Sequence, residues 1–317
     1  MLRFLSAGES HGRGVFCLLD GFPAGLRVVP SDIDVFLAER QKGYGRGGRQ
    51  RIEHDAVDVL SGIRGGITLG SPILLAVWNR DFEHWKHAMD PWAAPAGPKA
   101  EKVKQPRPGH ADLVGALKYR HDDCRNILER ASARETAARV AAGALCRKLL
   151  SVFGVDLAAH VVQIGDVCAA TDDVPSGEIA GRAGQSDVRC CDPVASERMI
   201  EAIRAAKQAK DTLGGVVEVR CWGLPPGLGT HTQWDRKLDG KIAQSLMSIQ
   251  AVKGIEIGLG FRGVDRPGSR FHDEITYEPH PEGGGTYRRI TNNLGGLEGS
   301  MTTGEELVIR VAKKPIS

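Results

Sequence analysis

An internal repeat is the feature that most constrains the fold of this chain. Residues 60–77 align without gaps with residues 294–311; six of the eighteen positions are identical, and five more exchange one aliphatic residue or Met for another. A shorter pair, 21–26 and 223–228, shares the pattern Gly-x-Pro-x-Gly-Leu. Because both pairs occur in the same order, they indicate an ancient duplication, with chance similarity between glycine-rich turns as the alternative.

The repeat also bears on domain organisation. A length of 317 residues fits one large domain or two ordinary ones. A duplication favours one domain over residues 1–317, with duplicated units at about 14–78 and 215–312. We expect a pseudo-two-fold axis relating these units and a functional site between the halves.

The local patterns predict an α+β fold. Strands are expected in the apolar runs at 14–20, 71–78, 158–165, 215–222 and 305–312. Helices are expected at 31–41, 133–150, 197–210 and 235–249, the first with Ser31 as its N-cap and Gly43 as its stop. The proline-rich stretch 89–108 is expected to be a loop. Since strands and helices do not alternate regularly, antiparallel pairing is favoured over a doubly wound sheet.

Composition excludes several classes of protein. The 42 basic and 39 acidic residues leave a net charge of +3, which is far from that of a histone-like protein. The longest uncharged stretch, 65–79, has fifteen residues, too few to span a bilayer. Charges at Arg3 and Glu9 interrupt the apolar start, so no signal peptide is expected. The seven cysteines show no C-x-x-C spacing. We expect a cytoplasmic protein with reduced thiols and no membrane partner.

A glycine-rich basic segment follows the first predicted helix. Its Gly-x-Gly-x-x-Gly pattern at 43–48 lacks the preceding strand of a dinucleotide-binding motif. The segment and its flanks carry many cations, namely Arg40, Lys42, Arg46, Arg49 and Arg51. A compact anion with several phosphates or carboxylates is the interpretation we favour. A solvated basic loop is the ordinary alternative, and nucleic acid is disfavoured by the low net charge and the 5% aromatic content.

Two histidines stand in unusual local contexts. His11 lies between glycines beside Ser10, and His110 lies between Arg107 and Asp112. Imidazole can donate a proton near neutral pH, so both are candidate acid-base residues, although each alone could be an ordinary loop histidine. His84 and His87 have no neighbouring cysteine, and we predict no metal site.

Anion binding is also suggested by residues 130–136, Arg-Ala-Ser-Ala-Arg-Glu-Thr, at the start of the alanine-rich helix. Backbone N–H groups, the Ser132 hydroxyl and the guanidinium groups of Arg130 and Arg134 suit phosphate or carboxylate. A capped helix, with Ser132 near the cap and Glu135 three residues later, explains the same residues. Both interpretations can hold together.

Taken together, these segments resemble the signature segments of the chorismate synthase family. They occur in the family's order and extend over essentially the whole chain: Gly-Glu-Ser-His-Gly at 8–12, the loop at 40–46, Arg-Pro-Gly-His-Ala-Asp at 107–112, 130–136, 248–256 and 292–299. The resemblance implies a lyase that converts 5-enolpyruvylshikimate-3-phosphate to chorismate and phosphate with reduced FMN. It also implies a helical layer sandwiched between antiparallel sheets, with internal pseudo-two-fold symmetry, and a homotetramer.

The resemblance assigns roles to particular residues. His11 and His110 would be catalytic, His11 as the acid that protonates the departing phosphate and His110 beside the flavin. Substrate would be bound by Ser10, His11, Arg40, Arg46, Arg107 and Arg134. FMN would be bound by Arg130, Ala131, Ser132, Gln250, Ala251, Gly299, Lys314, Pro315, Ile316 and Ser317. Arg40 and Arg46 would also contact NADP if NADPH serves as the reductant.

The sequence departs from the family pattern at its C-terminal end and at one internal position. Family members continue beyond residue 317 into a segment with a flavin-binding Arg and a catalytic Asp. We expect that segment to be missing from the given sequence rather than from the protein. Position 300 is Ser where a second glycine is commoner, which bears on the role of Gly299. Another FMN-dependent oxidoreductase and, less favoured, a nucleic-acid-binding protein are the alternatives.

Overall fold

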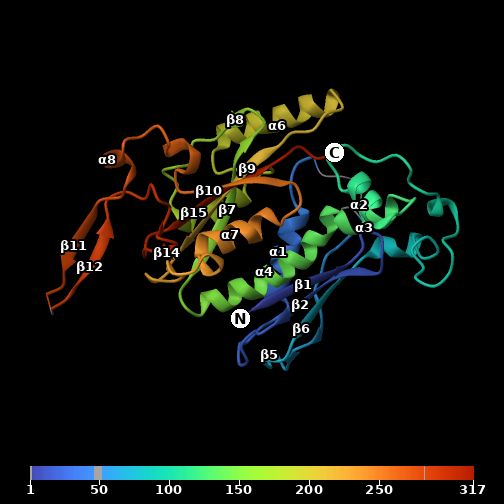
Figure 1. Ribbon diagram of the computed structural model, residues 1–317, viewed down its shortest axis with the longest axis horizontal. Coiled ribbons are helices and arrows are strands. Elements are labelled where there is room, and N and C mark those ends of the chain that lie inside the picture. Colours follow the sequence, from blue (N-terminus) through green and yellow to red (C-terminus); the bar gives the residue numbers. More distant parts are fainter. Residues whose placement is uncertain (1, 46–51, 282) are drawn as a thin grey trace. The chain divides into compact units, whose positions relative to one another are not determined.

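The computed structural model describes residues 2–45, 52–281 and 283–317, and its contacts divide the chain into two compact units (Figure 1). The first unit contains the residues up to Leu149, together with Ser317, and the second contains Leu150–Ile316. Both combine helices with antiparallel sheets, as the sequence predicts.

The sheet of the first unit has the strand order β1-β2-β6-β3 and is antiparallel throughout. Its strands are β1 (Arg3–Gly8), β2 (Gly14–Asp20), β6 (Ile73–Trp78) and β3 (Asp58–Ser61). Two short strands, β4 (Ile63–Arg64) and β5 (Ile67–Thr68), form a hairpin before β6. Apolar residues at alternate positions of β2 and β6 place one face of this sheet in the core.

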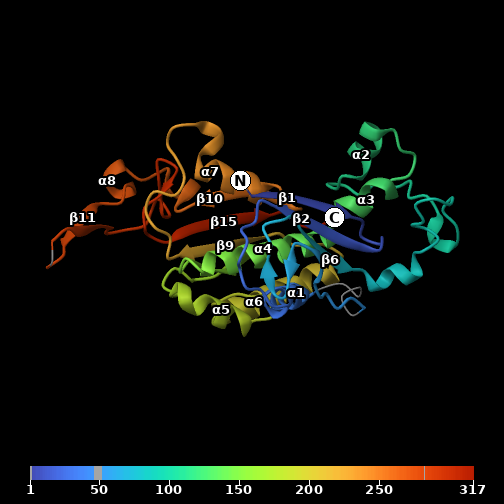
Figure 2. The same ribbon diagram turned by 90° about the horizontal axis from the view of Figure 1, so that it is seen from below.

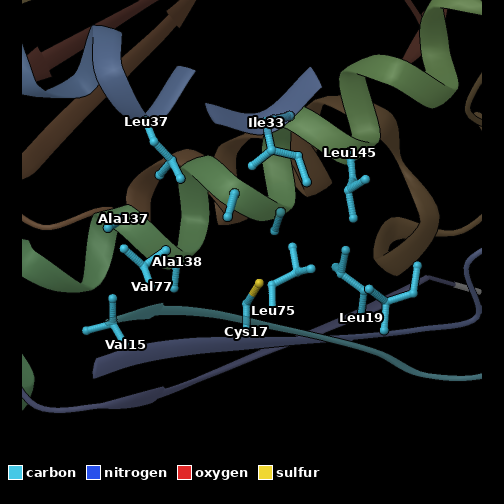
Figure 3. Close-up of a cluster of buried hydrophobic side chains, with 14 of the residues drawn as sticks. Val15, Cys17, Leu19, Ile33, Leu37, Leu75, Val77, Ala137, Ala138 and Leu145 are labelled. Carbon is cyan, nitrogen blue, oxygen red and sulfur yellow. The ribbon is translucent and has the colours of Figure 1, made fainter. Parts of the chain in front are cut away.

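Helices α1 (Ser31–Gln41) and α4 (Thr136–Ser151) cover that face. Figure 3 shows side chains of β2 and β6, among them Val15, Cys17 and Leu75, pointing toward the two helices. The helices contribute Ile33 and Leu37 from α1 and a row of alanines with Leu145 from α4. The small alanine side chains allow α4 to approach the sheet closely. Each fully buried large aliphatic side chain in such a core contributes about 1.5–3 kcal/mol.

Short helices and loops complete the first unit at one end of its sheet (Figures 1 and 2). They are the 3-10 helices η2 (Arg80–His84), η3 (Pro98–Ala100) and η4 (Ala133–Glu135), and the α-helices α2 (Asp112–Tyr119) and α3 (Arg125–Ala131). The predicted loop at 89–108 contains η3 and otherwise neither helix nor strand.

The sheet of the second unit has the order β10-β15-β9-β7-β8 and is also antiparallel. Its strands are β10 (Val252–Ile257), β15 (Leu307–Lys313), β9 (Gly215–Trp222), β7 (Asp156–Ile164) and β8 (Val167–Cys168). Helix α7 (Leu238–Met247) packs on the face that includes Cys221. Helix α5 (Ser176–Gly184) packs on the opposite face, with Trp222, and α6 (Pro193–Gln208) follows it. This sheet is therefore covered on both faces.

The remaining elements of the second unit are short. They are η5 (Trp234–Arg236), η6 (Gly260–Gly263), α8 (Gly268–Phe271) and two hairpins, β11 (Ile275–Pro279) with β12 (Gly285–Arg289), and β13 (Leu297–Glu298) with β14 (Met301–Thr302). Figure 1 shows the β11–β12 hairpin extending away from the sheet of this unit.

The two units repeat one hydrogen-bonded turn. Thr68 donates its hydroxyl to the carbonyl of Pro23 (2.7 Å) and accepts the N–H of Leu26 (3.0 Å). Thr302, its counterpart in the sequence repeat, donates to Pro225 (2.6 Å) and accepts from Leu228 (2.9 Å).

Strand register repeats as well. Leu19 pairs with Ile73 in the first unit, and their counterparts Cys221 and Leu307 pair in the second. The repeated turn and the repeated register are what a duplication predicts.

Some element boundaries differ from the sequence expectation. Ser31 is the first residue of α1 rather than its N-cap, and the carboxylate of Asp32 accepts the N–H of Val29 just before the helix. Helix α6 begins four residues earlier than expected because Asp192 caps it and Pro193 occupies its first position. Strand β6 begins at Ile73, directly after Pro72.

Candidate active site

A short loop between β1 and β2 presents Ser10 and His11, and Asn79 fixes its shape. The side-chain amide of Asn79, at the end of β6, donates to the carbonyls of Glu9 (3.1 Å), Ser10 (3.0 Å) and Gly12 (2.7 Å). Asn79 is 5% exposed. One buried amide thus satisfies three loop carbonyls, which leaves the loop little conformational freedom.

His11 is held by a buried carboxylate from helix α3. Its backbone N–H donates to Glu129 Oε2 (2.8 Å), and its Nδ1 lies 2.9 Å from both carboxylate oxygens. Glu129 is 3% exposed. Burial opposes ionisation of this acid, but hydrogen bonds from His11 outweigh it and lower the pKa of Glu129. The carboxylate is therefore ionised at neutral pH and accepts the proton on Nδ1.

The imidazole of His11 also stacks on an indole. The ring centroids of His11 and Trp85 are 4.0 Å apart, with an angle of 26° between the planes. Trp85 donates its Nε1–H to Asp81 Oδ2 (3.1 Å), and the same carboxylate oxygen lies 4.0 Å from His11 Nε2. Among the described residues, Nε2 of His11 makes no hydrogen bond, so it is the nitrogen able to reach a substrate.

Ser10 and Ser132 lie side by side. The backbone N–H of Ser10 donates to the carbonyl of Glu129 (2.9 Å), and Ser132 Oγ donates to Ser10 Oγ (3.2 Å). Ser132 also accepts the N–H of Arg134 (3.2 Å), which caps the 3-10 turn leading into α4. The hydroxyl is therefore a cap, as expected, and it also lies beside the His11 loop.

Arg130 and Ala131 form the end of α3 just before Ser132. The guanidinium of Arg130 donates to the carbonyl of Ser6 (3.0 Å) and to its hydroxyl (2.7 Å). Its side chain is still 41% exposed. The predicted flavin residues of this segment thus combine an accessible cation with a fixed backbone.

Arg134 joins the His11 loop to a buried carboxylate. Its Nη1 donates to Asp55 Oδ1 (2.6 Å) and its Nε donates to Asn79 Oδ1 (2.7 Å). Glu53 Oε2 lies 3.9 Å from Nη2. The side chain of Arg134 is 6% exposed, so its charge is neutralised within the protein.

Arg40 reaches the same carboxylate from helix α1. Its Nη1 donates to Asp55 Oδ2 (3.2 Å), its Nε to Thr136 Oγ1 (3.1 Å) and its Nη2 to the carbonyl of Ala133 (3.0 Å). Arg40 therefore ties α1 to the start of α4. Arg46, the other cation predicted in this segment, lies outside the described residues.

Arg107 and His110 form a second cluster, with Asp112. Arg107 Nε donates to Asp112 Oδ2 (2.9 Å), and His110 Nδ1 bonds Asp112 Oδ1. Asp112 is fully buried. Burial favours its neutral form, but hydrogen bonds from Arg107 and His110 hold its pKa below the usual value. In the described part of the chain, no hydrogen bond or ion pair joins this cluster to His11.

The second unit brings two of the predicted flavin segments together. Gln250 and Ala251 connect α7 to β10, and the N–H of Lys314 donates to the carbonyl of Ala251 (2.9 Å). Ala251 has a left-handed backbone with φ of 69°. The Nζ of Lys314 lies 3.0 Å from the carbonyl of Pro315, and the carbonyl of Ile316 accepts the Thr212 hydroxyl (2.6 Å).

Gly299 and Ser300 form the turn between β13 and β14, both with positive φ (54° and 68°). A Cβ on Gly299 would make only ordinary van der Waals contacts, the nearest with the Met301 side chain at 3.8 Å. Ser300 holds its unusual conformation with a hydrogen bond from Oγ to Asp239 (2.9 Å). Left-handed non-glycine residues are uncommon and tend to occur at functional sites.

Comparison with known proteins identifies the family. The sequence profile described as chorismate synthase matches residues 2–317. The chorismate synthase of Symbiobacterium thermophilum is 57% identical over 324 residues, covering all of this chain and 81% of that protein. That of Trichlorobacter lovleyi is 54% identical over 318 residues, covering 99% of this chain and 81% of that protein.

A solved structure titled "Crystal Structure of Chorismate Synthase" superposes with a TM-score of 0.83 at 44% identity, covering 99% of this chain and 85% of that one. The chain belongs to the chorismate synthase family. The sequence resemblance is thereby confirmed. The α+β fold with antiparallel sheets agrees with this chorismate synthase neighbour.

Several polar residues of this family member were not predicted from its sequence. They are Asn79, Asp55, Glu129, Asp81 and Trp85. A usable signal exists for two of them. Asn79 is a polar residue directly after a buried strand, and Glu129 directly precedes the predicted anion-binding segment 130–136.

The described residues of this chorismate synthase family chain contain neither a metal-binding cluster nor a membrane-spanning helix. Over residues 2–45, 52–281 and 283–317, no three or more His, Cys, Asp or Glu side chains come together as a metal site. None of the helices in the described part of the chain has the length and apolar character needed to cross a membrane.

Proposed function

We propose that this protein is a chorismate synthase, a lyase that converts 5-enolpyruvylshikimate-3-phosphate to chorismate and phosphate by 1,4-elimination, with reduced FMN as cofactor. Membership of the family over the whole chain supports the overall reaction. The observation that carries the mechanism is His11, whose Nδ1 is bound to the ionised Glu129 and whose Nε2 makes no hydrogen bond among the described residues.

His11 acts as the general acid. Its Nε2 donates a proton to the phosphate as the C–O bond to the leaving group breaks, which avoids the release of a more highly charged anion. Ser10, Arg40, Arg46, Arg107 and Arg134 orient the phosphate and the two carboxylates of the substrate. Arg107, whose side chain is 44% exposed, is more accessible than Arg40 (17%) or Arg134 (6%). Arg107 therefore makes a direct contact, while Arg40 and Arg134 also fix the shape of the site.

The residues expected to bind FMN fit a flavin phosphate and ring system. Gly299 presents a left-handed backbone that no Cβ shields, and Lys314 offers a partly exposed cation. Two of the five left-handed non-glycine residues in the described part of the chain, Ala251 and Ser300, lie at or next to predicted flavin residues. Arg130, Ala131, Ser132, Gln250, Pro315, Ile316 and Ser317 complete the set. When bound, reduced flavin supplies transient electron density to the breaking C–O bond.

His110 is the second catalytic residue and lies beside the flavin. Its Nδ1 bonds Asp112, and Nη2 of Arg107 lies 3.2 and 3.4 Å from its two ring nitrogens, so Asp112 and Arg107 together orient the ring. We further propose a homotetramer and, where NADPH is the reductant, contact with Arg40 and Arg46.

The test is an anaerobic assay with 5-enolpyruvylshikimate-3-phosphate, a catalytic amount of reduced FMN, and parallel reactions with and without NADPH. A chorismate synthase makes chorismate in large excess over the flavin. An FMN-dependent oxidoreductase would instead consume reductant in proportion to product. Absence of chorismate, or one reductant consumed per turnover, would overturn the proposal.

A further inference from the structure

We infer that Glu129 is a positioning residue that keeps the imidazole of His11 protonated at Nδ1, so that Nε2 is the nitrogen that gives up the proton, and that Trp85 fixes the plane of the ring. The inference rests on the proposed function for its chemical meaning. Its structural content concerns the contacts that Glu129 and Trp85 make with His11, and it can be tested without turnover.

The contacts of Glu129 are directed at one loop. Its backbone carbonyl accepts the N–H of Ser10 (2.9 Å), and its carboxylate accepts both the backbone N–H (2.8 Å) and the Nδ1 of His11 (2.9 Å). A single residue of α3 therefore sets both the position of the loop backbone and the rotation of the imidazole. A hydrogen bond to one ring nitrogen decides which nitrogen carries the proton in neutral histidine.

The charges around His11 come from three elements besides its own loop. Helix α3 contributes Glu129 and Arg125, whose Nη1 is 3.4 Å from Glu129 Oε1. The η2 segment contributes Asp81, 4.0 Å from Nε2. The η3 helix contributes Lys99, whose Nζ lies 4.4 Å from the centroid of the Trp85 indole. The loop of His11 itself contributes Glu9. Glu129 is the charge in hydrogen-bonding contact with the imidazole.

Trp85 restricts the remaining freedom of the ring. The two rings are stacked with their centroids 4.0 Å apart, so the imidazole cannot slide or rotate without losing contact with the indole. The indole is held in turn by its hydrogen bond to Asp81 and by the guanidinium of Arg125, 5.0 Å from the ring centroid. The ring of His11 is thus fixed at its face by Trp85 and at Nδ1 by Glu129.

The proton balance is simple. The Nε2–H bond of the imidazolium breaks, an O–H bond forms on the departing phosphate, and neutral imidazole protonated at Nδ1 remains. Glu129 stays ionised throughout and takes no proton. Its part resembles that of the carboxylate in a serine-protease triad, which orients the histidine without becoming protonated.

The direct test is ¹⁵N NMR of histidine-labelled full-length protein at alkaline pH, with the His11 signals assigned by their loss in His11→Asn. We expect wild type to carry the proton on Nδ1. Glu129→Gln keeps an oxygen acceptor and should keep this tautomer, whereas Glu129→Leu should shift it toward Nε2–H. Glu83→Gln, which changes an exposed carboxylate of the neighbouring η2 segment, is the matched control and should change nothing. A wild-type imidazole protonated at Nε2, or an unchanged tautomer in Glu129→Leu, would overturn the inference.

Steady-state kinetics give a second measurement. General-acid catalysis contributes about 10²–10⁴-fold, so Glu129→Leu should lower kcat by about 100-fold while KM changes by no more than about twofold. Glu129→Gln should lower kcat by about tenfold, because it keeps an oxygen acceptor for Nδ1 but not its charge. If kcat fell and KM rose by equal factors in both variants, with unchanged circular dichroism, the positioning role would be contradicted. If wild type makes no chorismate, the proposed function fails while the NMR result still decides this inference.

Discussion

Each unit has its own antiparallel sheet and repeats the same turn, but the units differ in how they connect two paired strands, β1 to β2 in the first and β7 to β9 in the second. In the first unit, residues 9–13 join β1 to β2 and carry Ser10 and His11. In the second, residues 165–214 join β7 to β9 and include β8, α5 and α6, with α5 packed on the second face of the sheet. The same strand register therefore supports a short loop with candidate chemistry in one unit and a helical cover in the other.

The face of the second sheet that α5 covers contains a row of charges, of which His160 and Glu218 are fully buried. His160 pairs with Glu218, which pairs with Arg310; the corresponding row of the first unit is Ala7, Phe16 and Ala76. The carboxylate of Glu218 lies 2.6 Å from Arg310 Nη2, 2.7 Å from Arg220 Nε and 3.2 Å from His160 Nε2. Arg220 also donates to the carbonyls of Thr171 and Val174.

This row explains how the long connection is attached. Arg220 joins the sheet to the segment before α5, and Glu218 balances its charge. The two sheets thus share a strand register, while the polar residues on them make different contacts. In the first unit the buried ions Asp55 and Arg134 lie beside the loop that carries His11, and in the second Glu218 and Arg220 hold a covering segment.

The largest expected effect comes from breaking the row. Glu218→Leu leaves the buried guanidinium of Arg220 without its carboxylate and leaves Arg310 paired with the exposed Asp172, which should lower the free energy of unfolding of the second unit by about 3–5 kcal/mol. Urea unfolding followed by intrinsic fluorescence measures it. Glu178→Leu, at an exposed ion pair on α5, is the control and should cost less than about 1 kcal/mol. Equal costs would show that the row is not what stabilises this face.

Acid should affect the second unit through the same residue. Burial opposes ionisation of Glu218, but hydrogen bonds from His160 and Arg220 and the charge of Arg310 lower its pKa from 4.5 to about 2. Because the folded pKa is the lower one, the stabilisation is present above about pH 5 and is lost as pH falls toward 2, on the order of 3 kcal/mol. Between pH 6 and pH 3, the urea midpoint of unfolding should decline less steeply in Glu218→Gln than in wild type. A parallel decline in both proteins would contradict this assignment.

The first unit should be most sensitive at Asn79. Asn79→Asp removes the amide that donates to three loop carbonyls and puts a carboxylate oxygen against them. We expect a loss of about 2 kcal/mol in the free energy of unfolding, with faster hydrogen exchange in residues 9–13. Asn126→Asp, at an exposed position on α3, should leave both unchanged. Normal exchange in the loop of Asn79→Asp would show that this amide does not fix it.

The smallest effect tests the repeat itself. Thr68→Val and Thr302→Val each remove one hydroxyl that makes the same two hydrogen bonds in its own unit. Both should cost about 1–2 kcal/mol, and the two values should agree within about 0.5 kcal/mol. Hydrogen exchange should increase only in the unit that carries the substitution. A large loss in the free energy of unfolding for one substitution and none for the other would show that the two turns, although alike in geometry, do not stabilise their units equally.

Much of the fold could be predicted because its strands and helices have strong local patterns. Strands β2 and β6 are nearly continuous apolar runs, and α4 shows a helical stripe of alanines. Strands β9 and β15 are mostly apolar, with Glu218, Arg220 and Arg310 set among valines, leucine and isoleucine. Strands β1 and β10 escaped prediction because they lie at sheet edges, where Arg3, Ser6, Lys253 and Glu256 interrupt the apolar pattern. Edge strands need no apolar alternation as strict as that of central ones.

The candidate site could be predicted only where its residues form local motifs. Ser10, His11 and Arg134 belong to such motifs. Glu129 and Asn79 act through contacts with residues 118 and 67–70 positions away, and no local pattern carries that information. The tertiary fold alone brings these partners together.

The central claim is that the short connection of the first unit carries the acid of the reaction. It is tested most directly by the kcat of His11→Asn for chorismate formation, measured anaerobically with reduced FMN beside wild type. The account predicts a loss of about 100-fold or more, with FMN binding retained. A kcat within about twofold of wild type would contradict it.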